Sequence, residues 1–458
     1  MTKEEIRSIV NAQREYFASG ETLDVNFRLK ALKKLKNAIK NNIDKINAAI
    51  KADLGKSAFE GYMCETGLTL SEISYMIKHT RSFAREKDVI SPIAQFPSRS
   101  YVKSMPYGVC LVMSPWNYPF LLTIEPLCDA IAAGNCVVLK PSAYSPATTR
   151  VMSEIIKETF EEKFVAVIEG GREENAHLLD EKFDYIFFTG GKTVGRLVME
   201  KASAHLTPVT LELGGKSPCI IDKSADVKLS ARRIVWGKYL NCGQTCVAPD
   251  YIYCHKAVKA KFIECVKKEI EKQFGNALEN ENYGKIINEK HFGRILGLID
   301  KEKVVAGGGS DKLKLKIEPT VMDNVTREDR VMQEEIFGPV MPVLEFESID
   351  TVIKVVNDNP KPLALYVFAR DKKVIKAVTG KCAFGGGCVN DVVIHLATSR
   401  MGFGGVGESG MGSYHGKYGF DTFSHKKSIV DKKLWLDLPM RYQPFKRINE
   451  ILIHMFLR

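Results

Sequence analysis

Five short apolar segments, each joined to the next by sequence of helical character, occupy residues 108–215. They are "GVCLVMS" (108–114), "NCVVLKPS" (135–142), "FVAVIEGG" (164–171), "DYIFFTGG" (184–191) and "PVTLELGG" (208–215). Apolar strands that alternate with helices are typical of a parallel sheet that helices cover on both faces. Ligands of such sheets bind beyond the carboxyl ends of the strands, so we expect the site near residues 114–117, 140–143 and 189–191.

Composition restricts the class of protein further. The 458 residues are 45% hydrophobic and 26% charged, which suits a globular chain with more than one domain and a large core. The net charge of +11 comes from lysines spread along the chain without an aromatic-basic module, so we expect no nucleic-acid partner. Eleven scattered cysteines, no signal peptide and no membrane-length apolar run predict a reducing, cytoplasmic location.

Three segments outside the five strands have clear patterns. Apolar residues at steps of three and four over residues 29–50 predict one amphipathic helix. The proline-punctuated residues 91–107 predict a loop or hairpin that leaves the main body. Strands and helices continue over residues 217–390, and a glycine-rich return, "GFGGVGESGMGSYHG", follows.

The tail of the chain, residues 445–458, predicts an amphipathic helix. Lys446 and Arg447 lie on its other side. Such a helix packs on the body of the protein or on a partner subunit; alternatively it contacts a membrane surface or covers a tunnel for a long aliphatic substrate. Its apolar face is made of Phe445, Ile448, Ile451, Leu452, Met455 and Phe456.

A glycine-rich turn, "FFTGGKTVGRLV", places Gly190, Gly191 and Gly195 between a strand and a helix. Glycines at this position let backbone N–H groups approach a phosphate at a helix N-terminus. The spacing differs from GxGxxG, so a plain tight turn is the alternative. If this turn belonged to a Rossmann motif, the acidic residue about 20 positions after it would bind a ribose hydroxyl, and that residue is Glu212.

Two residues suggest covalent chemistry. Glu212 lies between two leucines, where burial can raise the pKa of its carboxyl group to the range of a general base. The alternative is a structural carboxylate at the end of a strand that accepts hydrogen bonds from turn amides, and the motif favours neither. Cys246, in "NCGQTCVAPDY", is a candidate nucleophile, a metal ligand together with Cys242, or a small core residue. A metal would need two further ligands, and the nine histidines show no paired spacing, so we expect no metal site.

Seven motifs occur in the order found in the aldehyde dehydrogenase superfamily. The sequence resembles the class 3 and fatty-aldehyde branch of this family over essentially its whole length. The resemblance implies an α/β fold: a Rossmann-like, doubly wound cofactor domain, a second α/β catalytic domain and a small β arm for oligomerisation. The motifs are "SPWNYP", "LKPS", "FFTGG", "LELGGKSP", "GQTCVAPD", "EEIFGPV" and "FGGVGESGMG".

The resemblance also implies roles for individual residues. Cys246 resembles the nucleophile that forms a thiohemiacetal and then an acyl-thioester. The Asn117 amide and the Cys246 N–H resemble the oxyanion hole. Glu212 resembles the base that activates water, which replaces its assignment to a ribose. The residues that resemble the family's contacts to NAD or NADP are Trp116, Lys140, Ala143, Thr189, Gly190, Gly195, Glu335 and Phe337.

One position departs from the family pattern. Many NAD-using relatives carry a glutamate three residues after the lysine, where it binds the adenosine ribose, and this chain has Ala143 there. Without that carboxylate, the 2′-phosphate of NADP meets less repulsion while Lys140 remains to attract it. The alternative is that Ala143 is neutral and other groups hold the ribose.

The expected organisation follows from the resemblance. Residues 1–207 form the dinucleotide-binding domain with the 91–107 arm, residues 208–392 the catalytic domain, and residues 393–458 the return segment, an oligomerisation strand and the terminal helix. The expected activity is NAD(P)-dependent oxidation of medium- or long-chain aliphatic or aromatic aldehydes to carboxylic acids by a homodimer. The alternatives are a CoA-acylating aldehyde dehydrogenase and a thiol esterase without redox chemistry.

Overall fold

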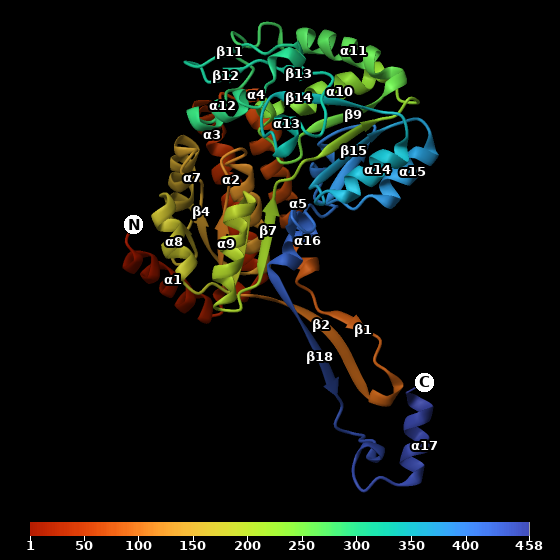
Figure 1. Cartoon of the computed structure of the whole chain (residues 1–458). Helices are drawn as coiled ribbons and strands as arrows, with labels where there is room; N and C mark the ends of the chain where they lie inside the picture. The colour runs from red at the N-terminus through yellow and green to blue at the C-terminus, as the bar shows by residue number, and fades with distance from the viewer. Residues whose placement is uncertain (458) are drawn as a thin grey trace.

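The chain forms two α/β regions and an arm that projects from them (Figure 1). The computed structural model describes residues 1–457. Within them lie a six-stranded sheet, a seven-stranded sheet, a three-stranded sheet in the arm and a small two-stranded sheet. The first two sheets confirm the predicted α/β class, since most of their neighbouring strands run parallel.

The six-stranded sheet contains all five of the strands predicted from the sequence. Its order is β17-β7-β6-β3-β4-β5, and only β17 runs antiparallel to its neighbour. Every residue of the neighbouring interior strands β3 and β4 is buried, which explains why their sequences are apolar except for Lys140 at the end of β4. The strands are β3 Val109–Met113, β4 Cys136–Lys140, β5 Val165–Val167, β6 Tyr185–Gly190, β7 Val209–Leu213 and β17 Gly410–Met411.

Helices connect these strands where the sequence predicted them. The helix after β3 is buried along its whole length and ends at Gly134, whose φ of 103° lies in the left-handed region that glycine tolerates best. The next helix begins with Pro146, a residue favoured in the first turn. The connecting helices are α6 Leu121–Ala133, α7 Pro146–Thr159, α8 Arg172–Asp180 and α9 Lys192–Ser203.

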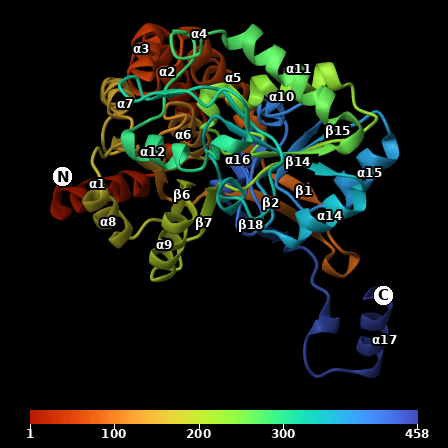
Figure 2. The same cartoon turned by 45° about the horizontal axis from the view of Figure 1, so that its top comes forward.

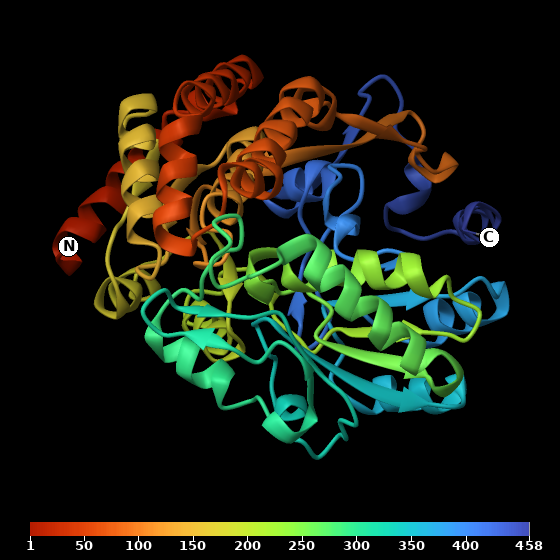
Figure 3. The same cartoon turned by 90° about the horizontal axis from the view of Figure 1, so that it is seen from above.

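The N-terminal segment corrects one prediction. The expected single helix over residues 29–50 is two helices, because the backbone leaves the helical region at Asn42, which has φ −119° and ψ 15°. Most of the predicted apolar stripe is nevertheless buried, with Leu29 and Ile43 partly exposed, and these helices pack beside α6 and α7 (Figure 3). The helices of this segment are α1 Lys3–Ala18, α2 Val25–Asn41, α3 Ile43–Leu54, α4 Ala58–Gly61, a π-turn at Tyr62–Thr66, and α5 Gly67–Phe83.

The seven-stranded sheet has the order β10-β13-β14-β9-β8-β15-β16. Only β10 and β13 pair antiparallel. Its strands are β8 Pro218–Ile221, β9 Tyr251–His255, β10 Val304–Ala306, β13 Thr320–Met322, β14 Val340–Phe346, β15 Ala364–Phe368 and β16 Gly386–Val389. The accompanying elements are α10 Val227–Tyr239, α11 Lys256–Phe274, α12 Glu289–Leu296, α13 Arg330–Gln333, α14 Ile349–Asp358, α15 Lys372–Lys381, and the small pair β11 Ser310–Asp311 and β12 Lys316–Ile317.

The first sheet extends beyond the boundary expected at residues 207/208. Strand β7 pairs with β6 through Leu213, and β17 from the return segment pairs with β7. The expected boundary therefore runs through one sheet, and the first region includes residues from both ends of the chain. The division into domains remains a prediction.

The arm is built from β1 Lys87–Val89, β2 Ser98–Pro106 and β18 Ser424–Lys432. Strand β18 pairs antiparallel with β2 over nine residues, from Ser424 opposite Pro106 to Lys432 opposite Ser98. As expected from its prolines, the 91–107 segment leaves the main body. Helix α16 Gly416–Thr422 connects the body to β18.

The chain ends in helix α17 Arg447–Phe456, which lies near the tip of the arm and apart from both α/β regions (Figure 2). The helix is therefore present as predicted, but it is not docked on the body of its own chain. Ile448, Ile451 and Met455 on its apolar face are each more than half exposed. Within residues 1–457, no helix has both the length and the apolar character needed to cross a membrane.

Candidate active site

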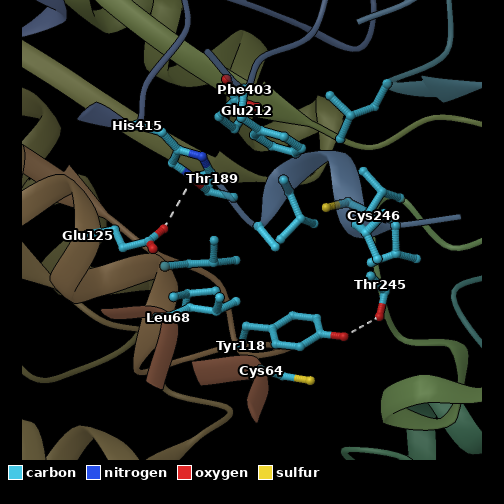
Figure 4. Close-up of a pocket in the computed structure, with 18 of the residues that line it drawn as sticks. Cys64, Leu68, Tyr118, Glu125, Thr189, Glu212, Thr245, Cys246, Phe403 and His415 are labelled. Carbon is cyan, nitrogen blue, oxygen red and sulfur yellow. Dashed lines mark hydrogen bonds and ion pairs between the residues drawn. The ribbon is translucent and has the colours of Figure 1, made fainter. Parts of the chain in front are cut away.

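A cavity of about 320 Å³ contains Cys246, Glu212 and Thr189 in its wall. Most of the other side chains in its wall are apolar. Figure 4 labels polar side chains of the wall, among them Tyr118, Glu125, Thr245 and His415. The lining residues include Met63, Leu68, Tyr118, Leu121, Leu122, Trp236, Leu240, Val393, Ile394, Leu396 and Phe403. The cavity is therefore a largely apolar space with a thiol and a carboxyl group in its wall.

Cys246 follows a backbone segment of unusual conformation. Asn241, Cys242 and Gly243 have φ values of 51°, 52° and 72°, and such a run is costly for the two residues that carry side chains. A Cβ atom at Gly243 would lie 2.2 Å from the Gly338 carbonyl oxygen, so only glycine fits there. The segment is not α-helical, and Cys242 is buried in the core.

The Cys246 thiol is not activated by its surroundings. Burial, and after it the nearby carboxyl groups of Glu335 and Glu212, raise the pKa of Cys246 to about 12. The thiol is therefore neutral near pH 7, and a base or a cation must act on it before it becomes a nucleophile.

Glu212 lies near the end of β7 and is only 3% exposed. Neither of its carboxyl oxygens has a hydrogen-bond partner among the described residues. Burial raises its pKa well above the ordinary value, which is the direction predicted from its leucine neighbours. A carboxyl group with a raised pKa and unoccupied oxygens can accept a proton near neutral pH.

Asn117 belongs to the loop that follows β3. Its Nδ2 donates a hydrogen bond to the Gln244 carbonyl oxygen at 3.0 Å, two residues before Cys246. The side chain is buried and lies beside the segment of residues 241–246, and it is not among the residues that line the cavity. An amide has two N–H groups, so one remains after this bond.

The glycine-rich turn has a more specific explanation than the sequence provided. A Cβ atom on Gly195 would lie 2.7 Å from the Leu213 side chain, and one on Gly190 would lie 2.6 Å from the Phe188 ring. These two glycines therefore permit close packing around β6 and α9. Gly191, at the N-terminus of α9, has open space around its Cα, and the Thr189 hydroxyl is buried with no hydrogen-bond partner within residues 1–457.

Lys140 and Ala143 lie at the end of β4, beyond the cavity. The Lys140 ammonium is buried and donates to the carbonyl oxygens of Pro141 and Gly170 at 2.9 and 2.7 Å. Burial lowers the pKa of Lys140 to about 8, against the attraction of Glu174. Ala143 is exposed in the turn that follows.

Glu335, Phe337 and Trp116 form another group. The Phe337 and Trp116 rings meet edge to face with centroids 5.4 Å apart. Burial raises the pKa of Glu335 to about 8, and its Oε1 has no hydrogen-bond partner among the described residues. A Cβ atom on Gly214 would lie 2.1 Å from the Glu335 carboxyl, so this carboxyl rests on the turn after β7.

The sequence analysis missed one polar pair in the cavity wall. His415 Nε2 lies 3.3 Å from Glu125 Oε2, and both side chains are almost fully buried (Figure 4). Burial alone would lower the pKa of His415, but Glu125 and then Glu72 raise it overall. Glu125 is one of two acids in an otherwise apolar helix, "LLTIEPLCDAIAA", and that isolation was an available signal.

Comparison with known proteins agrees with this geometry. The family model described as the aldehyde dehydrogenase family matches residues 1–429. The 4,4'-diaponeurosporen-aldehyde dehydrogenase of Staphylococcus aureus is 45% identical over 94% of this chain and 95% of its own length. The dimeric NADP-preferring aldehyde dehydrogenase of Mus musculus is also 45% identical, with the same coverage of both chains.

Solved structures have the same fold. A substrate-bound state of Staphylococcus aureus AldH is 43% identical, with a TM-score of 0.97 over 99% of both chains. A betaine aldehyde dehydrogenase of Staphylococcus aureus in complex with NAD+ is 29% identical, with a TM-score of 0.85 over 95% of this chain and 90% of the other. Since the match extends over nearly the whole sequence, the chain belongs to the aldehyde dehydrogenase family and is an oxidoreductase that acts on aldehydes.

Proposed function

We propose that this enzyme oxidises aldehydes to carboxylic acids through a covalent bond to Cys246, with NAD or NADP as the electron acceptor. The observation that carries the proposal is the presence of the Cys246 thiol and of the Glu212 carboxyl, which has no hydrogen-bond partner among the described residues, in the wall of one largely apolar cavity. A nucleophile and a base in the same cavity can form an acyl intermediate and then hydrolyse it.

In the first step the thiol loses its proton and its sulfur attacks the aldehyde carbon. Glu212 is the candidate acceptor for this proton, because its oxygens are unoccupied and its pKa is raised. The carbonyl oxygen becomes an alkoxide, to which the Cys246 N–H and the second Asn117 N–H donate. The product of this step is a thiohemiacetal on Cys246.

The residues around the turn fit a dinucleotide. A phosphate would fit at the N-terminus of α9, where Gly191 leaves open space and the Thr189 hydroxyl has no partner among the described residues. Ribose hydroxyls would fit beside the buried ammonium of Lys140 and the Glu335 oxygen that has no partner among the described residues. Trp116 and Phe337 offer ring surfaces beside them. Nicotinamide, when bound, supplies the two-electron acceptor that oxidation to a thioester requires. The names of the relatives include both an NADP-preferring enzyme and an NAD+ complex.

Hydrolysis completes the cycle. Glu212 first passes the proton taken from the thiol to solvent. It then removes a proton from water as the water oxygen attacks the thioester carbon, the carbon–sulfur bond breaks, and the carboxylic acid leaves. The Cys246 thiolate takes this second proton from Glu212, so one proton is released for each aldehyde oxidised. The presence of Glu212 favours water over CoA as the acyl acceptor, which supports a hydrolytic enzyme over a CoA-acylating one. The apolar lining supports medium- or long-chain aliphatic or aromatic aldehydes as substrates.

We also propose a homodimer in the cytoplasm. In the described residues β18 pairs on one side only, so its other edge is available to a strand of a second subunit. The exposed apolar face of α17 would be buried by the same partner. The cytoplasmic assignment is supported by eleven cysteines that are all free thiols.

Replacing the nucleophile tests the first step. We expect Cys246→Ser to lose turnover by orders of magnitude and to keep its affinity for NAD or NADP, because a serine hydroxyl is a far weaker nucleophile in this cavity. Steady-state rates and cofactor titration by fluorescence measure the two properties. Cys265→Ser, a half-buried cysteine of α11, is the control. Turnover above about a tenth of wild type in Cys246→Ser would contradict the assignment.

Replacing the base separates acylation from hydrolysis. We expect Glu212→Gln to produce a burst of reduced cofactor, followed by slow steady turnover; a slowed burst would mean that Glu212 also deprotonates Cys246. Because the pKa of Glu212 is raised, the wild-type rate should fall as the pH drops below that raised value and the base becomes protonated. Stopped-flow absorbance over a pH series measures both effects. Wild-type steady-state rates in Glu212→Gln would rule out the base role, and the exposed Glu173→Gln is the control.

Cofactor choice tests Ala143. We expect wild type to accept NADP, and Ala143→Glu to weaken NADP binding about tenfold or more with little effect on NAD. The reason is repulsion between the new carboxylate and the 2′-phosphate, reduced by solvent at this exposed position. Ala143→Gln adds similar bulk without the charge and serves as the matched control. Equal NADP affinities in wild type and Ala143→Glu would make Ala143 a bystander.

The apolar face of α17 tests the dimer. We expect wild type to be a dimer by light scattering, and the pair Ile448→Glu and Ile451→Glu to shift it towards monomer, because charges would be buried at the interface. Glu450→Lys changes charge at another exposed position of the same helix. A wild-type monomer at every concentration would refute the dimer. Sedimentation of wild type with anionic vesicles, lost in the double variant, would assign this face to a membrane surface instead.

A further inference from the structure

A fully buried ion pair lies behind the nucleophile segment. Lys56 Nζ and Glu65 Oε1 are 2.7 Å apart, and both side chains are 0% exposed. A buried pair of this kind contributes little net stability, because removing both charges from water offsets most of their attraction. Its presence in the core therefore calls for a reason other than stability.

The Lys56 ammonium has three partners. It donates hydrogen bonds to Glu65 Oε1 and, at 3.0 Å, to the Asn117 carbonyl oxygen, and it lies 3.9 Å from the centre of the Tyr118 ring. The second oxygen of Glu65 accepts from the Phe120 N–H at 2.9 Å. The ion pair thus holds the backbone of residues 117–120 from two sides.

Glu65 reaches this position from the π-turn at Tyr62–Thr66. Such turns insert one extra residue into a helix and are frequent at functional sites. Here the turn brings Glu65, Thr66 and Cys64 into the interior. The π-turn therefore places Glu65 where the ion pair can contact the loop of residues 117–120.

From Asn117 the network continues to the segment that carries Cys246. The Asn117 carbonyl oxygen also accepts from Asn241 Nδ2 at 2.7 Å, and Asn117 Nδ2 donates to the Gln244 carbonyl oxygen at 3.0 Å. Glu60 accepts from the Asn241 N–H at 2.8 Å. These bonds hold the left-handed residues 241–243 in place.

We propose that Lys56 and Glu65 are positioning residues for the oxyanion hole. By fixing the Asn117 backbone, they fix the direction of the Asn117 amide, and so the N–H group that faces the aldehyde oxygen on Cys246. The inference rests on the proposed oxyanion role of Asn117. An apolar pair of similar volume would fill the same space, but it could not donate to the Asn117 carbonyl.

The experiment compares four variants with wild type: Asn117→Ala, Lys56→Met, the double variant Lys56→Met with Glu65→Gln, and Lys56→Met combined with Asn117→Ala. Lys56→Met alone leaves Glu65 unpaired and should lower the thermal midpoint. The neutral double variant should recover much of that midpoint, because it leaves no unpaired charge. Lys259→Met, which breaks a partly buried ion pair with Asp323 on the seven-stranded region, is the control for loss of stability without loss of rate.

We expect Asn117→Ala to lower kcat by about a hundredfold or more, as loss of an oxyanion donor does. The neutral double variant should lower kcat at least about tenfold, with KM and cofactor Kd within about threefold of wild type, because the donor is misdirected rather than absent. Adding Lys56→Met to Asn117→Ala should change kcat less than about twofold, since residues that act through one group are not additive.

Each failure has its own signature. If Asn117→Ala keeps the wild-type kcat, the oxyanion assignment in the proposed function is wrong and the inference falls with it. If Asn117→Ala is impaired while the neutral double variant has the wild-type kcat, only the positioning role is wrong. If Lys56→Met lowers kcat by the same factor with and without Asn117, the pair acts by another route and the inference is overturned.

Discussion

The parallel ladder through β6, β3 and β4 is the constraint on which the site depends. Its register sets Met113 opposite both Lys140 and Phe188, and the next pair of strands sets Thr189 opposite Glu212. Backbone hydrogen bonds alone therefore bring groups from four distant parts of the sequence to one sheet edge. Lys140, Thr189 and Glu212 therefore need no direct bonds among themselves to be collected there.

Burial is the second feature of the site, and it acts on Cys246 and Glu212 in the same direction. Burial raises the pKa of Cys246 and of Glu212, so the resting site holds a neutral thiol beside a carboxyl with a high proton affinity. Reactivity then depends on a proton transfer inside the cavity. A neutral thiol is a weak nucleophile, so burial limits the reaction of Cys246 with other electrophiles.

The sequence predicted the strands well and the long-range polar contacts poorly, for physical reasons. Buried parallel strands are apolar along nearly their whole length, so they can be recognised in the sequence as short apolar runs. The apolar steps of three and four continue across Asn42, so the periodicity did not reveal the break in the helix there. The sequence feature that marks the break is Asn42 itself, whose side-chain amide donates a hydrogen bond to the Ala38 carbonyl oxygen. The positions of Cys246 and Glu212 follow from local motifs. The contact from Lys56 to Asn117 spans 61 positions and has no local pattern.

The left-handed run at residues 241–243 has a consequence for the order of folding. Its conformation is unfavourable in isolation, and the groups that hold it come from Glu60, Asn117 and the carbonyl of Lys285 through Gln244. A chain in which the N-terminal helices have not yet docked lacks Glu60 directly, and its Asn117 loop lacks the Lys56–Glu65 pair that contacts it. Its cysteine segment is then not held in the conformation of the folded protein. Competence for catalysis is thereby tied to completion of the whole fold.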